Sequence, residues 1–245
     1  MALLSPYHTA SALLLGLGLL AGCTAPQPGT QLPGLNVGQA ALDSGAPQIA
    51  LRISTVKLAQ SPNDIDALVM QGEAYSETGL PENALIDFNK ALALAPDSIP
   101  ARLGLGRLAL ATDPLKAETL FLAVVTEQPR NVAALNDLGI ARDLQGHHAE
   151  AQKAYALALG VAPDARAPMV NLALSMALSG QASQARNLLA PLAAASDATP
   201  RVRQDYALAS ELTGDHATAT QVLQSDMSPS QAQAALSGYD ALVAP

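Results

Sequence analysis

The chain has 245 residues, of which 49% are hydrophobic, 14% are charged and only 3% are aromatic. This apolar content excludes a chain that is mostly disordered, and a core of Ala, Leu and Val favours closely packed helices over a β-sandwich. The 21 acidic and 13 basic side chains give a net charge of −8. Acidic character and few aromatic rings argue against nucleic acid as a partner, because such sites use positive charge and base stacking.

The chain begins with a short apolar segment that ends at its only cysteine. The apolar run over 10–20 is shorter than the roughly 20 residues needed to span a bilayer, and it has the length of a secretory signal. The following Leu20-Ala21-Gly22-Cys23 resembles the lipobox of bacterial lipoproteins. The resemblance implies that residues 1–22 are a cleaved signal peptide and that Cys23 carries the lipid. The alternatives are a free buried cysteine or an ordinary cleaved signal.

The residues after the cysteine indicate where a lipoprotein of this kind would reside. Several acyl chains on Cys23 would anchor the protein stably in a membrane. Thr24 follows Cys23, whereas Asp at that position would favour inner-membrane retention by analogy with enterobacterial lipoproteins. We therefore expect the outer membrane, with the protein facing the periplasm. Residues 23–34 are uncharged and rich in Pro and Gly, which predicts a flexible tether between the lipid and a folded body.

The remaining chain repeats one pattern at intervals of about 34 residues. Small residues mark the intervals at Ala84, Ala117, Ala151, Ala185 and Ala219. A bulky residue follows each of them by four positions, at Phe88, Phe121, Tyr155, Leu189 and Leu223. A glycine precedes four of them by five positions, at Gly79, Gly146, Gly180 and Gly214. Small residues let two helix axes approach closely, and glycine ends a helix in the left-handed conformation.

This ladder resembles the tetratricopeptide repeat, a helix–turn–helix unit of 34 residues. The resemblance implies an all-α solenoid over 35–245, with five clear repeats, one degenerate N-terminal repeat and a C-terminal capping helix. The clear repeats are 65–98, 99–131, 132–165, 166–199 and 200–233, and the degenerate repeat is 31–64. Ser228-Pro229 is a helix start signal, which predicts the capping helix over about 229–243.

The sequence contains no motif that carries catalytic chemistry. His148 and His216 occupy equivalent turn positions, and we interpret them, with His147, as solvated turn residues rather than metal ligands. Gly104 and Gly106 imitate a dinucleotide motif, but they lie within a predicted helix and indicate close packing. Once Cys23 is lipidated, no thiol remains for a disulfide, a metal or a nucleophile. We therefore expect no enzymatic activity, no cofactor and no small-molecule substrate.

The inner face of such a solenoid comes mainly from the first helix of each repeat, which predicts a groove for a protein partner. Ile140, Leu174 and Leu208 form an apolar line at the ninth position of three successive repeats, and Asn136 and Asn171 could hydrogen-bond a peptide backbone. The predicted groove residues are Arg107, Asn136, Ile140, Asp143, Val170, Asn171, Leu174 and Leu208. An amphipathic helix or an extended apolar segment would suit them. The alternative is that the ninth position is half-buried in ordinary packing.

Segments 134–146 and 226–239, together with the lipobox, resemble the TadD family of lipoproteins that assemble tight-adherence (Flp) pili. The resemblance implies a pilotin-like protein that binds the outer-membrane pilus secretin and promotes its assembly. A general periplasmic scaffold that recruits peptidoglycan hydrolases or polysaccharide-export proteins is the alternative. An enzyme with a helical repeat domain is disfavoured, because no stretch outside the repeats is long enough for a catalytic domain.

Overall fold

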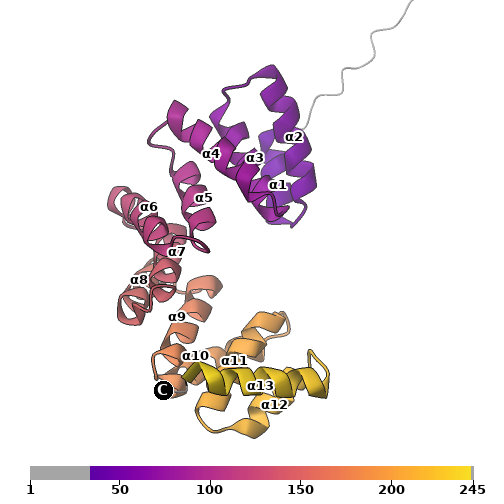
Figure 1. Cartoon of the computed structure of the whole chain (residues 1–245), viewed down its shortest axis with the longest axis vertical. Coiled ribbons are helices and arrows are strands. Elements are labelled where there is room, and N and C mark those ends of the chain that lie inside the picture. Colours follow the sequence, from indigo (N-terminus) through magenta and orange to yellow (C-terminus); the bar gives the residue numbers. More distant parts are fainter. Residues whose placement is uncertain (1–33, 244–245) are drawn as a thin grey trace, which may run out of the picture. The chain divides into compact units, whose positions relative to one another are not determined.

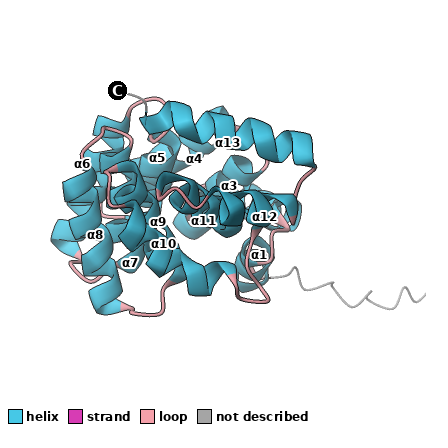
Figure 2. Ribbon diagram, turned by 90° about the horizontal axis from the view of Figure 1, so that it is seen from below, coloured by secondary structure: helices cyan, strands magenta, loops and turns pink. Residues whose placement is uncertain are grey.

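The computed structural model describes residues 34–243, with side chains described as far as residue 239 (Figure 1). The predicted signal peptide, Cys23 and nearly all of the predicted tether lie outside these residues. The described residues form thirteen helices joined by short loops, without a strand (Figure 2). The helices are α1 (Leu35–Asp43), α2 (Pro47–Gln60), α3 (Ile65–Glu77), α4 (Pro81–Leu94), α5 (Ile99–Ala109), α6 (Pro114–Glu127), α7 (Val132–Asp143), α8 (His148–Val161), α9 (Arg166–Leu178), α10 (Ala182–Ala193), α11 (Pro200–Leu212), α12 (His216–Gln224) and α13 (Pro229–Val243).

Each odd-numbered helix from α1 to α11 packs against the helix that follows it, which makes six helical hairpins. Neighbouring hairpins contact mainly through the second helix of one and the first helix of the next, as α2 does with α3 and α6 with α7, and some first helices, such as α3 and α5, also contact each other. The last helix, α13, packs on α11 and α12. Its Ala232 and Leu236 are buried beside Ala219 and Leu223 of α12, so α13 covers the end of the last hairpin as the capping helix was expected to do. None of the described helices is both long and apolar enough to cross a membrane.

The hairpin turns use the glycines that the sequence pattern singles out. Gly79 has φ +75° and Gly214 has φ +80°, and Gly45 of the first hairpin has φ +72°. This left-handed region disfavours residues with a Cβ, so glycine is the favoured residue at these turns. The second repeat has no glycine there, and at the start of its second helix the Asp113 side chain accepts a hydrogen bond from the Lys116 backbone N–H at 3.0 Å.

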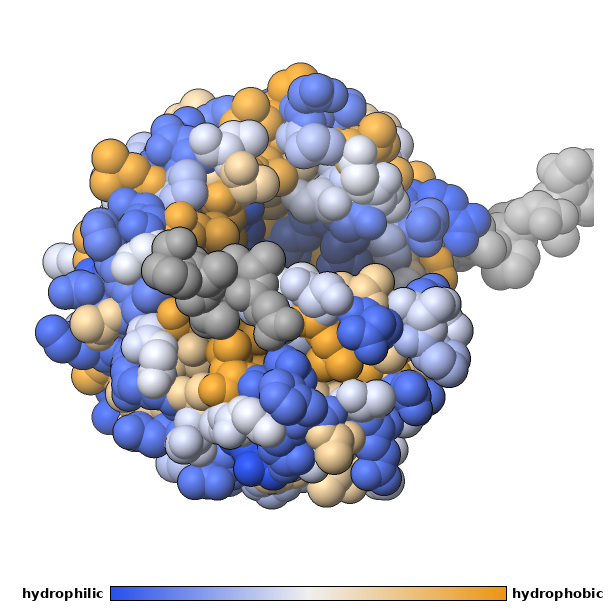
Figure 3. Space-filling view, turned by 60° about the horizontal axis from the view of Figure 1, so that its bottom comes forward, coloured by the Kyte–Doolittle hydropathy of each residue, from blue (hydrophilic) through white to orange (hydrophobic). Residues whose placement is uncertain are grey.

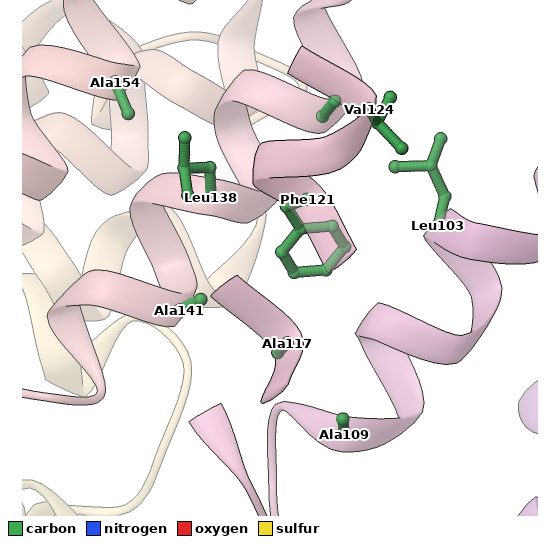
Figure 4. Packing of buried hydrophobic residues seen from close by; sticks show 9 residues of the cluster. Leu103, Ala109, Ala117, Phe121, Val124, Leu138, Ala141 and Ala154 are labelled. Carbon is green, nitrogen blue, oxygen red and sulfur yellow. The ribbon is translucent and has the colours of Figure 1, made fainter. Parts of the chain in front are cut away.

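The core lies where the two helices of a hairpin meet the next hairpin. The five marker alanines are completely buried, and the five bulky residues that follow them are at most 1% exposed. Figure 4 shows one such cluster, with the Phe121 ring surrounded by Leu103, Leu138 and several alanines. A Cβ built on Gly106 would lie 2.4 Å from Cε1 of Phe121, so this glycine has the packing role that was predicted for it.

Candidate protein-binding face

The predicted groove residues lie on the first helices of successive hairpins, where the structure joins some of them directly. Asn171 on α9 donates a hydrogen bond through Nδ2 to Oδ1 of Asn136 on α7, at 2.8 Å. Both side chains are half-buried, as are Ile140 and Leu174 on the same two helices. The two asparagines therefore use one amide N–H and one carbonyl lone pair on each other. Other donor and acceptor positions of the two amides remain for a partner.

A buried carboxylate extends this polar link toward the N-terminal repeats. Arg107 on α5 donates through Nε to Oδ2 of Asp137 at 2.7 Å, and Asn136 Nδ2 lies 3.3 Å from Oδ1 of the same carboxylate. Asp137 is only 6% exposed and was not among the residues predicted from the sequence. The signal that could have found it is an acidic residue 30 positions after Arg107, in a helix that packs against the arginine's own hairpin.

Two of the predicted groove residues belong to the core instead. Val170 and Leu208 are each 5% exposed. Val170 packs in a cluster with Ala173, Leu189 and other residues of the fourth and fifth clear repeats. The prediction that they line an open groove is therefore wrong, because both side chains are buried, and Val170 packs with Val202 and Ala209 of the next hairpin. The apolar line keeps Ile140 and Leu174 as its half-exposed members.

Asp143 is held by contacts within the protein. Its Oδ1 lies 2.8 Å from Nδ1 of His148 and accepts a hydrogen bond from the Ser175 hydroxyl at 2.7 Å. Its Oδ2 accepts a hydrogen bond from the buried Tyr155 hydroxyl at 2.9 Å. Burial, reinforced by the negative charge of Asp143, raises the pKa of Tyr155. Asp143 therefore connects three helices, α7, α8 and α9.

We interpreted the turn histidines from the sequence as solvated residues, but two of them also lie beside a carboxylate. His216 Nδ1 lies 2.6 Å from Oε1 of Glu211, which repeats the His148–Asp143 arrangement two hairpins further along. In each case the carboxylate lies five residues before the histidine, at the end of the first helix. The described residues contain no group of three or more His, Cys, Asp or Glu side chains placed to hold a metal ion.

A groove of about 530 Å³ lies between α1, α3 and α5, and we call it the acidic groove. It is lined by Gln39, Leu42, Asp43, Glu73, Ser76, Glu77, Phe88, Gly104, Arg107 and Leu108. Burial raises the pKa of Glu73; Arg107 opposes this rise, while the charges of Glu77 and Asp43 add to it. Arg107 is the one residue of the acidic groove that also belongs to the set of predicted groove residues given above. A space-filling view shows a hollowed surface bordered by both hydrophilic and hydrophobic residues (Figure 3).

The first complete pair of clear-repeat helices, α3 and α4, occupies the segment recognised by a family model. Residues 65–98 match the model described as tetratricopeptide repeat. A tetratricopeptide repeat protein from Parabacteroides merdae has 18% identity, covers 84% of this chain and 82% of its own, and superposes with a TM-score of 0.66. The fold is that of a tetratricopeptide-repeat protein. The all-α class predicted from the sequence is thus confirmed.

Two further solved structures have the same fold. PilW, described as a widely conserved type IV pilus biogenesis factor, has 17% identity, covers 82% of this chain and 96% of its own, and gives a TM-score of 0.70. A thermophilic tetratricopeptide-repeat protein from Thermus thermophilus has 20% identity, covers 72% of this chain and 99% of its own, and gives a TM-score of 0.60. Identities this low show the fold alone. No curated protein sequence matches the chain. The tetratricopeptide-repeat fold is a scaffold for interaction with other proteins.

Proposed function

We propose that this protein is a non-enzymatic lipoprotein of the outer membrane that binds protein partners in the periplasm. Its finer role would be that of a pilotin-like factor, which helps to assemble the secretin of a Flp/Tad pilus. The observation that carries the proposal is a combination of two features. One is the lipobox-like segment ending at Cys23, and the other is a face of the repeats with half-exposed apolar and amide side chains. Membrane attachment would raise the effective concentration of the scaffold beside an outer-membrane partner.

The half-exposed side chains of α7 and α9 support a binding role for this face. Ile140 and Leu174 offer apolar area, and the Asn136–Asn171 pair beside them offers amide groups to a peptide backbone. A surface of this composition suits an amphipathic helix or an extended segment with alternating apolar residues. Binding energy rather than turnover would perform the function.

The pilus assignment depends on the resemblance of segments 134–146 and 226–239 to the TadD family. The fold likeness to PilW, itself a pilus biogenesis factor, is compatible with the assignment and adds only that this fold serves in such a protein. The second candidate is a general periplasmic scaffold for peptidoglycan hydrolases or polysaccharide-export proteins. The same anchor and the same half-exposed face would serve that role equally well.

Purification of the tagged, detergent-solubilised protein from its native envelope tests the proposal, with mass spectrometry of the proteins that accompany it. A secretin and other pilus components among them would support the pilotin-like role. Cell-wall hydrolases or polysaccharide-export proteins in their place would overturn that role and favour the general scaffold. A variant with Leu157→Glu provides the control, because Leu157 is 62% exposed on α8, a second helix outside the proposed face.

A further inference from the structure

The face made by the first helices changes character along the chain. Its ninth repeat position carries Gln39, Glu73 and Arg107 in the first three hairpins, then Ile140, Leu174 and Leu208 in the last three. Its thirteenth position carries Asp43, Glu77 and Ala111, then Leu144, Leu178 and Leu212. Apart from Ala111, the residues at these two positions are polar or charged in the first three hairpins, whereas all six are apolar in the last three, where Leu208 is buried in the core.

The polar part of this face has a negative charge that the protein does not neutralise. Asp43, Glu73 and Glu77 all line the acidic groove, and none of them forms a salt bridge in the described part of the chain. The one basic side chain that lines the groove, Arg107, donates its Nε to Asp137 on α7, at 2.7 Å. Since Asp137 already partners this guanidinium, the groove retains an excess of carboxylate charge.

The walls of the acidic groove fit a long cationic side chain rather than a metal ion. Leu42 and Leu108 line the groove together with the carboxylates, and Gly104 lines it without a side chain that would fill it. Lys and Arg place an aliphatic stem on apolar surface and hold the charged end against a polar group. The three carboxylates, by contrast, are not grouped closely enough to hold a metal ion.

We propose that the acidic groove binds a lysine or arginine side chain carried by a segment of the protein partner. The inference rests on the proposed function, that this face binds protein, and it adds the chemistry of one contact. Arg and Lys paired with partly desolvated carboxylates contribute to both affinity and choice of partner. The groove therefore selects, among segments with apolar residues for α7 and α9, those that also present a basic residue toward α3.

A phage-displayed library of random peptides, selected on the detergent-solubilised full chain, tests this contact. Parallel selections use the variant Glu73→Gln/Glu77→Gln and the control Asp66→Asn/Glu82→Gln, which removes the same charge from exposed positions outside the groove. We expect Lys or Arg to be enriched at one peptide position on the wild type and on the control, and this enrichment to disappear on Glu73→Gln/Glu77→Gln. Circular dichroism verifies that each variant retains its helices.

Fluorescence anisotropy then measures a double-mutant cycle between peptide and protein. It uses one selected peptide and a copy of it in which the enriched Lys or Arg is replaced by Gln. The replacement should weaken binding to the wild type about tenfold and leave binding to Glu73→Gln/Glu77→Gln nearly unchanged. Selected peptides without a basic preference, or a preference that survives in Glu73→Gln/Glu77→Gln, would overturn the inference and leave the binding function standing. A selection that enriches no peptide on any form would contradict the binding function itself.

Discussion

A Cβ built on Gly104 would lie 2.4 Å from Cζ of Phe88, so the two residues fit together only because one has no side chain. Gly104 belongs to α5 and Phe88 to α4, and the contact thus fixes how closely two successive hairpins approach. Gly104→Ala should destabilise the protein by about 1–2 kcal/mol, since the overpacked ring must move, although alanine favours the helix. Thermal unfolding followed by circular dichroism measures the change.

The matched control for this substitution is Gly160→Ala. Gly160 also lies within a helix, α8, but a Cβ built there meets nothing within 4 Å. This variant should be stabilised by about 0.5–1 kcal/mol through helix propensity alone. Equal effects of the two substitutions would show that packing against Phe88 does not limit the approach of the hairpins.

The carboxyl group of Asp87 makes stability depend on pH. Asp87 is 8% exposed and its Oδ2 has no hydrogen-bond partner among the described residues. Burial raises its pKa to about 6, while Lys90 opposes the rise. A raised folded-state pKa of an acid means that stability is greatest below the unfolded pKa of about 4 and declines as pH rises toward about 6.

Asp87→Asn should therefore stabilise the protein by about 1 kcal/mol near neutral pH and lose this advantage near about pH 4. We expect this stabilisation to be smaller than the full pKa shift of Asp87 would imply, because water still screens part of the side chain's charge. Urea unfolding at the two pH values measures the difference. Asp66→Asn, at an exposed position of α3, is the control for the loss of one carboxylate. A constant effect of Asp87→Asn at both pH values would contradict a raised pKa.

The half-exposed apolar residues of α7 and α9 should be required for partner binding. The double variant Ile140→Glu/Leu174→Glu should abolish capture of the partner, because two carboxylates would replace apolar contact area. Helical content by circular dichroism should stay unchanged. Leu157→Glu, at a position 62% exposed on the second helix of the hairpin, is the control and should bind normally. Normal capture by the double variant would remove this surface from the binding site.

Lipid attachment at Cys23 should determine where the protein resides. Cys23→Ala should leave the fold intact and shift the protein from the membrane fraction to the soluble fraction, since one residue carries the whole proposed anchor. Fractionation of the cell envelope, with immunodetection of the protein, measures the distribution. Mutant protein that stays with the membrane would refute anchoring through this cysteine.

Much of the fold could be predicted because the residue types that the packing requires recur at fixed intervals in the sequence. The alanines at close helix contacts are fully buried, and Gly79, Gly146, Gly180 and Gly214 all adopt positive φ at the turns. Each repeat solves the same local packing problem with the same residue types, so the pattern was visible without knowledge of the tertiary structure. The degenerate first hairpin followed from stepping the same interval backward.

The candidate site was harder to predict, because exposure depends on the neighbouring hairpin and not on position within a repeat. Leu174 and Leu208 occupy equivalent positions, yet Leu174 is half-exposed and Leu208 is buried. The bond between Arg107 and Asp137 joins residues 30 positions apart, and the acidic groove needs side chains from three hairpins. Spacing alone does not reveal such side-chain pairings between repeats.

The substantial contacts of every described helix reach no further than two helices along the chain. The stability of each hairpin consequently depends on its own contacts and those with its immediate neighbours, and hardly at all on distant hairpins. Duplication of an internal hairpin would lengthen the row of first helices without disturbing the contacts at either end. Such a duplication would add one more first helix to the proposed binding face.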